Sequence, residues 1–472
     1  MSSNSKITDR RRTLIFINIL IACIASSMLS TALTTALLPI MKDLHVSVAT
    51  GQWLTSGYSL AMGIIMPLTA FLITRFPTKK LYLTGIGLFI AGLVICALAP
   101  VFPAMMCGRI LQACGNGILT AMAQVILLTI YPIERKGTIM GWYGLSVGAA
   151  PVIAPTLAGM LVDTLGWRMI FYVSIGIMFA AFLFAIAVFD DVLETVDRKF
   201  DLISFAISIF AFGGITLGIG NIGAYSLTGI QTYLPLITGC IASAVFVYRQ
   251  LHLDAPFLNL RILKSRDYTL SVIGSMLLYL VMMGSSIIMP LYVQSIMGYS
   301  ATISGLVTLP GSLAMAVVSP FAGKIFDKLG MKKLFITGAL CMLFSNAGMI
   351  FVTMHMPLMI AAAYNVVRCI AIGCLMMPLV TWGTNSVHAR FTADATALLT
   401  SLRTIAGAVG SAVFVGIMTA VSEHSIPDYG KNAPMHGLNV SFMAMTFGTL
   451  FLLCIAVFLV RPDAKACKTV LD

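Results

Sequence analysis

Three arginines interrupt stretches of sequence that otherwise contain no charge: Arg109, Arg368 and Arg403. An arginine at the centre of a bilayer costs about 2.5–3.5 kcal/mol or more, so such a residue is expected to face protein or water and to serve a function. Arg109 is the strongest candidate for binding or coupling; the structural alternative is a buried guanidinium that bonds carbonyls or Gln52. Arg368 and Arg403 are its weaker counterparts, since either could lie near a helix end and extend to the interface.

Uncharged polar side chains lie in the same stretches. They complete the set of candidate binding or coupling residues, which are Ser30, Thr34, Gln52, Tyr58, Gln112, Asn116, Gln124 and Asn365. The chain also contains 30 methionines and 27 phenylalanines. Flexible thioether and aromatic walls adapt to varied apolar ligands, although most of these residues are expected only to pack. Together they predict a cavity for a hydrophobic or amphiphilic small molecule.

Acidic residues are missing from the centre of every apolar stretch. Proton exchange usually relies on an ionisable side chain whose pKa changes between states, and a pocket for cations usually holds a carboxylate. The nearest acids are Asp43 and Asp163, for which capping of an outer loop is the simpler explanation. With arginines present and carboxylates missing, a neutral or anionic amphiphile fits better than a dication. The sequence has no CxxC pair or Cys/His cluster, so we expect neither a metal site nor a disulfide framework.

The polar candidates lie in an unusually apolar chain. Its residues are 59% apolar and 10% charged, with a mean hydropathy of +0.98, whereas soluble domains are about 25% charged. A bilayer core needs about 20 apolar residues in a helix, and helices are the plausible spans for runs of this length. Fourteen spans are predicted, at 14–40, 51–74, 81–99, 104–130, 138–162, 168–189, 203–223, 230–249, 269–292, 303–323, 334–353, 357–381, 397–420 and 440–460. The sequence therefore predicts an all-α membrane protein, whose first span we interpret as a retained signal-anchor.

Lysine and arginine residues gather on alternate loops of this pattern. The side that carries both termini has 23 of them and the other side has 3. Because positive charge accumulates on cytoplasmic loops, both termini are predicted to be cytoplasmic. The same rule accounts for the net charge of +12, so nucleic-acid binding is not expected.

The sequence also repeats itself. Residues 67–85 match residues 320–338 at a constant offset, with a proline, a Lys-Lys pair and a glycine in register. A repeat in the same orientation implies two six-helix bundles related about the membrane normal, with a site between them. The predicted 6+2+6 architecture therefore has an N-terminal bundle (1–189), a linker region with two spans (190–268) and a C-terminal bundle (269–472).

The fifth predicted span carries the most specific motif. Residues 144–171 read GLSVGAAPVIAPTLAGMLVDTLGWRMIF, with Gly148, Pro151, Pro155 and Gly159 on a Gly/Pro pattern. This motif resembles the antiporter signature of the major facilitator superfamily, and specifically of its fourteen-helix drug/proton antiporters of the EmrB/QacA type. The resemblance covers essentially the whole chain. Small residues permit close helix packing and prolines bend a helix, so the motif predicts a gating segment, with packing alone as the alternative.

The loops after the second and tenth predicted spans resemble the cytoplasmic loop motif of the superfamily. The second copy, with Asp327, Lys332 and Lys333, matches well. In the first copy Thr74 replaces the aspartate, which leaves Arg75 either as part of a weaker latch or only as a determinant of topology. Such a loop can hold an inward gate shut through charge pairing and helix-end contacts.

The resemblance implies a secondary active transporter. It would export hydrophobic or amphiphilic small molecules across a bacterial cytoplasmic membrane by alternating access, in exchange for protons. No bound cofactor is implied, since the proton gradient would be the energy source. Arg109 resembles the arginine of the fourth-helix motif of the family, and Ser30 stands where the family commonly has an aspartate. The chain is expected to be a monomer in the lipid bilayer, and a periplasmic adaptor is left open.

Other functions compete with multidrug efflux. A physiological exporter of a lipid, fatty acid or metabolite, with weak or no drug transport, is the main alternative. A sensor or channel is a third possibility, which the matched halves disfavour. An enzyme is not expected because no catalytic constellation falls within the spans. The sequence lacks a GxxxxGK[ST] phosphate loop, which argues against an ATP-driven pump.

Overall fold

The structure is a computed structural model that describes residues 8–46, 48–193, 195, 201–221, 229–253, 256, 258–299 and 301–461. Within these ranges every regular element is a helix and there is no strand. The prediction of an all-α chain is confirmed. Each of the fourteen stretches predicted as a span contains a long helix.

Six long helices make up the first half of the chain. Their bounds are α1 (Asp9–Asp43), α2 (Val48–Arg75), α3 (Thr78–Leu98), α4 (Phe102–Ile130), α5 (Lys136–Leu165) and α6 (Arg168–Val188), with a short η2 (Ile133–Arg135) before α5. Pro77 directly precedes α3, and Pro103 lies in the first turn of α4. Proline is tolerated at helix starts because the first N–H groups have no partner within the helix.

Six further long helices make up the last part of the chain. Their bounds are α9 (Arg266–Leu291), α10 (Ala301–Leu329), α11 (Met331–Met349), α12 (Leu358–Asn385), α13 (Thr392–His424) and α15 (Ala433–Cys454). The short elements before, between and after them are η3 (Leu260–Lys264), η4 (Tyr292–Ile296), η5 (Ala389–Phe391), α14 (Ile426–Tyr429), η6 (Gly430–Asn432) and η7 (Ile455–Leu459). Gly330 joins α10 to α11 with a φ of 77°, a backbone conformation that residues other than glycine rarely adopt.

The two sets of six helices repeat the same packing. In the first set α1 packs on α5 and α6, α4 packs on α2 and α3, and α3 packs on α6. The second set has the corresponding pairs, with α9 on α13 and α15, α12 on α10 and α11, and α11 on α15. Between the sets, α2 packs on α13 and α5 packs on α10. Because α2 corresponds to α10 and α13 corresponds to α5, a pseudo-twofold rotation turns one of these contacts into the other.

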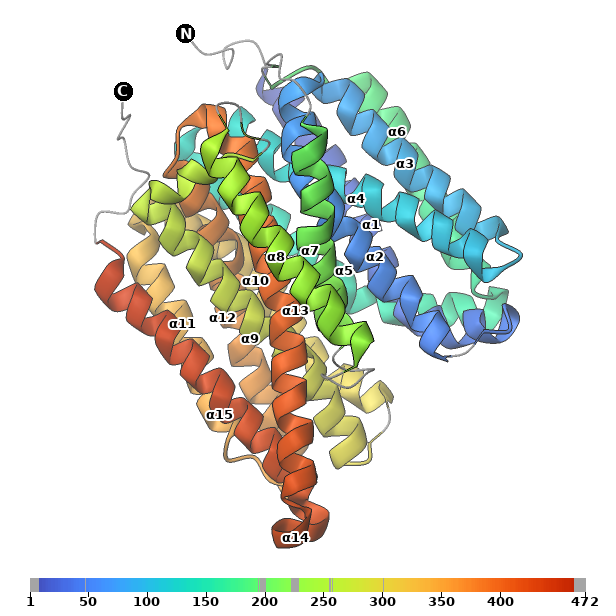
Figure 1. The fold of residues 1–472 in the computed structure, drawn as a ribbon, viewed down its shortest axis with the longest axis vertical. Coiled ribbons are helices and arrows are strands. Elements are labelled where there is room, and N and C mark those ends of the chain that lie inside the picture. Colours follow the sequence, from blue (N-terminus) through green and yellow to red (C-terminus); the bar gives the residue numbers. More distant parts are fainter. Residues whose placement is uncertain are drawn as a thin grey trace.

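Two helices lie between these sets in the sequence, α7 (Leu202–Asn221) and α8 (Ile230–His252). They pack on one another, and α7 also packs on α2 and α13. In Figure 1 they appear in green, in front of the junction between the blue first set and the yellow-to-red second set. The extra pair therefore covers one of the two seams between the sets.

Eleven helices of the described chain are long and apolar enough to cross a membrane. The long helices outside this group are α2, α5 and α11. Several side chains of α2 and α5 are outside the described part of the structure, and α11 starts with a Lys-Lys pair after Met331. The count of fourteen membrane spans and the three domain boundaries therefore stay predictions.

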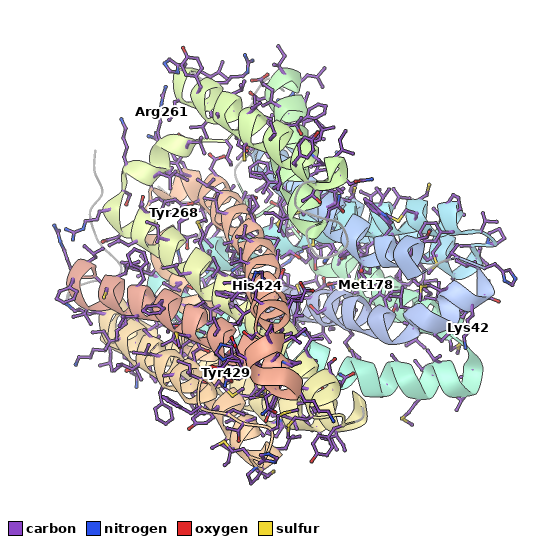
Figure 2. All side chains as sticks on the ribbon, turned by 60° about the horizontal axis from the view of Figure 1, so that its bottom comes forward. Lys42, Met178, Arg261, Tyr268, His424 and Tyr429 are labelled. Carbon is purple, nitrogen blue, oxygen red and sulfur yellow. The ribbon has the colours of Figure 1, made fainter. Side chains whose placement is uncertain are left out.

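The side of the molecule on which α1 begins and η7 ends is called the terminal face here, and Figure 1 marks both chain ends on this side. Arg11 pairs with Asp190, just after α6, at 2.8 Å. Arg266, at the start of α9, donates to the Leu459 carbonyl at 3.1 Å. The terminal face is the predicted cytoplasmic face. On the opposite side, Lys42 at the end of α1 and Tyr429 in α14 lie apart, as Figure 2 shows.

Candidate functional site

A cavity of about 290 Å³ lies between the two sets of helices. Both sets contribute to its wall. The lining residues are Cys23, Ser26 and Ser27 of α1, Tyr58, Met62 and Met66 of α2, Asn116, Thr120 and Gln124 of α4, Tyr143 and Val147 of α5, Tyr279 of α9, Met376 and Met377 of α12, and Thr400, Arg403 and Thr404 of α13. This central cavity combines methionines, tyrosines, small hydroxyls and one arginine, and its described lining contains no carboxylate.

Arg109 lies behind this wall and does not line the cavity. Its side chain is 2% exposed. Nε donates to the Leu54 carbonyl at 3.0 Å and Nη1 donates to Oε1 of Gln112 at 2.6 Å. The guanidinium also stacks on the Tyr58 ring, 4.1 Å from its centroid, and Tyr58 accepts a hydrogen bond from Asn116 at 2.8 Å. Arg109 can therefore act on the cavity by positioning Tyr58.

Arg403 has the opposite surroundings. It lines the cavity and is 5% exposed, and its guanidinium lies 4.8 Å from the centroid of the Tyr279 ring. Its Nε and Nη1 atoms are buried without a hydrogen-bond partner in the described structure. The same holds for Oγ1 of Thr400, one turn earlier on α13. Buried polar groups are normally hydrogen-bonded, so these donors are available to a partner within the cavity.

Arg368 is buried within the second set and does not line the central cavity. It donates a short hydrogen bond to Oδ1 of Asn365, three residues earlier on α12. Asn365 lies against α10, since a Cβ added to Gly311 would meet its Nδ2 at 2.7 Å. Arg109 and Arg368, which fall in corresponding helices, thus each bond a side-chain amide three residues away. Neither is at a helix end.

For several predicted site residues only the backbone belongs to the described part of the structure. These are Ser30 and Thr34 in α1, Gln52 in α2, and Gly148, Pro151, Pro155 and Gly159 in α5. Their backbones belong to helices that reach the cavity or the α5–α10 seam. The alternative in which Arg109 bonds Gln52 therefore also lies outside the described part of the structure. The alternative of a bond to a carbonyl is present, since Arg109 donates to the Leu54 carbonyl.

Asp327 joins the two sets at the terminal face. It lies near the end of α10 and accepts hydrogen bonds from the N–H groups of Gly137 and Thr138 at 2.8 Å each. The Thr138 hydroxyl adds a third at 2.7 Å. A carboxylate at a helix start satisfies free N–H groups and is favoured by the helix dipole. Gly323 allows this approach, because a Cβ there would lie 2.1 Å from the Gly137 carbonyl oxygen.

The basic residues of the loop motif lie at the ends of α2 and α11. Lys332 is partly buried and Lys333 is exposed in the first turn of α11. Arg75 is the last residue of α2 and is exposed. The hydroxyl of Thr74, which replaces the aspartate in this copy, donates to the Phe71 carbonyl at 2.9 Å within α2 itself. In the described structure the aspartate copy links the two sets through its side chain.

Asp394 is a buried acid that sequence reasoning passed over. It is 1% exposed in the first turn of α13 and is the one acidic residue buried in the described structure. Its sequence signal was an acid just inside a helix start after Arg390, a position that the helix dipole favours. Tyr279 and Thr400 of the cavity wall were also missed, because single tyrosines and threonines in apolar runs give no distinguishing signal.

Two matched sets of six helices, a shared cavity and a seam closed at one face define a membrane carrier of two bundles. The model of the Major Facilitator Superfamily matches residues 15–411, and the chain belongs to this family. It is 35% identical over 430 residues to the lincomycin resistance protein LmrB of Bacillus subtilis (strain 168), covering 89% of this chain and 88% of that protein. The multidrug export protein EmrB of Haemophilus influenzae is 26% identical over 394 residues, covering 81% and 76%.

The solved structure of the proton:xylose symporter XylE has the same fold, with a TM-score of 0.64 and 14% identity over 96% of each chain. The chain is therefore a multi-pass membrane transporter of the major facilitator fold. Its resemblance to the drug-efflux branch, inferred from residues 144–171 and the loop motifs, is confirmed by these relatives.

Proposed function

We propose that this protein exports hydrophobic or amphiphilic small molecules across a bacterial cytoplasmic membrane by alternating access, in exchange for protons. The observation that carries the proposal is the central cavity, whose wall comes from both sets of helices. A site at the junction of two matched bundles can be opened to either side when one bundle rocks against the other. The relatives named for lincomycin resistance and multidrug export support the class of substrate.

The orientation follows from the charge pattern. If the terminal face is cytoplasmic, the described state is closed towards the cytoplasm, because Asp327 of α10 caps the start of α5 on that side. Opening inwards requires the carboxylate to leave these N–H groups. The close approach of Gly323 to Gly137 makes this seam a discrete contact, which is either formed or broken.

Proton exchange needs a group that changes protonation during the cycle. Asp394 is the buried acid of the described chain, at the start of a helix that packs against α2 across the second seam. We propose it as the coupling residue, because motion at that seam would change its exposure to water and hence its pKa. Asp327, at the other seam, acts as a gate.

Accumulation in efflux-deficient cells tests the export proposal. The native chain should lower the accumulation of an amphiphilic dye, and an uncoupler should abolish the difference. Asp394→Asn should behave like the uncoupler, while Asp201→Asn, which changes an acid that pairs with Arg249 outside the cavity, serves as the matched control. Equal accumulation with the native chain and with an empty vector, with and without uncoupler, contradicts the proposal.

A further inference from the structure

The arginine of the central cavity is an incomplete ion-binding site. No hydrogen bond or ion pair from Arg403 occurs within the described residues, and its Nε and Nη1 are buried without partners. The closest acid along α13 is Asp394, nine residues away, which is about 13 Å of helix. An arginine stays charged in a protein, so the cavity holds a positive charge that no described protein group neutralises.

We propose that Arg403 binds the negatively charged group of the substrate, and that the substrates of this carrier are amphiphilic monoanions such as carboxylates with an apolar body. The inference rests on the proposed export function and specifies its substrate class. A carboxylate at this position would accept hydrogen bonds from the guanidinium, and Thr400 Oγ1, also unpartnered, lies one turn away to donate another. Charge-assisted hydrogen bonds of this kind are about twice as strong as neutral ones.

The remaining wall suits the apolar body of such a molecule. Met62 and Met66 of α2 face the cavity from the first set, and Met376 and Met377 of α12 face it from the second. Unbranched thioethers adapt to differently shaped apolar groups. The wall therefore selects the anionic group through one fixed charge and tolerates variety in the remainder of the molecule.

Tyr279 keeps the arginine in place without neutralising it. The guanidinium lies over its ring at 4.8 Å, a contact that holds a cation against a face while leaving its N–H donors free. An anion bound there would leave both charges paired, so the loaded cavity could close at a lower cost than the empty one.

A negatively charged substrate also changes the energetics of export. With a negative cell interior, each 100 mV of membrane potential favours outward movement of a monoanion about fiftyfold. The potential thus drives the substrate outwards while it drives protons inwards. This advantage does not extend to a neutral analogue of the same shape.

A matched pair of probes tests the assignment. The purified chain in phosphatidylglycerol nanodiscs is titrated at pH 7.5 with dansylamino-undecanoic acid and with its primary amide, which has the same shape without the charge. We expect the native chain to bind the acid at least tenfold more tightly. Arg403→Gln should lower affinity for the acid to that for the amide and leave the amide unchanged, and Arg403→Lys should keep most of the preference.

Arg249→Gln is the control, since this variant loses an arginine that pairs with Asp201 outside the cavity; it should bind both probes like the native chain. Equal binding of acid and amide by the native chain overturns the assignment, as does an Arg403→Gln variant that loses both probes equally. If neither probe binds while cells still export a neutral compound in an uncoupler-sensitive way, the anionic site is wrong and the export function stands.

Discussion

The arginine of α4 and the arginine of α13 have the same chemistry and opposite surroundings. Arg109 donates to a carbonyl and to Gln112 and stacks on Tyr58, all within the first set of helices. Arg403 stacks on Tyr279 and leaves donors unpaired at the cavity between the sets. Both are at least 95% buried, so burial alone does not distinguish a structural arginine from a binding one.

The difference lies in where the hydrogen-bond partners come from. A buried charge whose donors are satisfied by its own bundle stabilises that bundle, and truncating it leaves its partners unpaired. A buried charge without partners destabilises the empty protein and is retained where a ligand completes it. Arg109 is thus a positioning residue of the fold, and Arg403 is a binding residue whose cost is offset when substrate is present.

The largest expected effect is the loss of Arg109. Arg109→Met should lower the free energy of unfolding by about 3 kcal/mol, because the Leu54 carbonyl and the Gln112 amide lose a charged partner. Transport of anionic and neutral compounds should fall together, since Tyr58 loses its support. Thermal unfolding in detergent and export assays on the same preparations measure the two effects. A fully stable Arg109→Met variant that fails only with anions would reverse the roles given to the two arginines.

The opposite sign is expected for Arg403. Arg403→Met should raise the free energy of unfolding of the ligand-free protein by about 1–2 kcal/mol, because an unpaired buried charge is replaced by an apolar side chain of similar length. Export of anionic amphiphiles should be lost in the same variant. Unfolding curves recorded with and without the acid probe check both parts, and the probe should stabilise only the native chain. A variant less stable than the native chain would show that Arg403 has partners within the protein.

A smaller effect is expected at the tyrosines beneath the two guanidinium groups. Tyr58→Phe removes the hydroxyl that accepts from Asn116 and should cost about 1 kcal/mol. Tyr279→Phe keeps the aromatic face under Arg403 and should change stability by less than about 0.5 kcal/mol. Unfolding midpoints of the two variants, compared side by side, measure the difference. Equal losses at both positions would mean that the Asn116 contact contributes nothing specific.

The smallest effect is expected at an arginine on the surface. Arg168 bonds Asp43 at 2.7 Å with both side chains partly exposed, and this hydrogen bond lowers the pKa of Asp43 below its usual value. A lowered pKa means that the pair contributes stability above about pH 4 and loses it as Asp43 is protonated at lower pH. Arg168→Gln should therefore lower the melting temperature slightly at pH 7 and not at all near pH 2. A difference that persists at pH 2 would assign the effect to the stacking of Arg168 on Trp167.

The outline of the fold could be predicted because membrane spans are set by local composition. An apolar run of about 20 residues has one stable outcome in a bilayer, and each of the fourteen runs contains a helix of the structure. The repeat between residues near 70 and near 320 likewise anticipated the paired packing of the two sets. The loop motif named Asp327 as a gate residue; the structure places its carboxylate on the N–H groups of Gly137 and Thr138 across a seam, and its role in gating stays a prediction.

The site was only partly predictable, because a cavity between two bundles depends on how those bundles pack. Tyr58, Asn116, Gln124 and Arg403 were in the predicted set and do line it, whereas Gln112 and Asn365 lie elsewhere as partners of arginines. Arg368 was grouped with Arg109 from their positions in corresponding helices. Their positions in the sequence do not determine whether Arg109 or Arg368 faces a ligand.

The sequence by itself determined that this is a helical membrane protein of two matched halves with arginines buried inside it, since hydropathy, charge asymmetry and the repeat are properties of the chain read in order. Only the tertiary structure decided which of these arginines is satisfied and which is not. The reason is physical: the hydrogen-bond partners of Arg109 come partly from α2, and those of Arg403 would have to come from across the cavity. Side-chain satisfaction depends on distances between helices, which no single helix specifies.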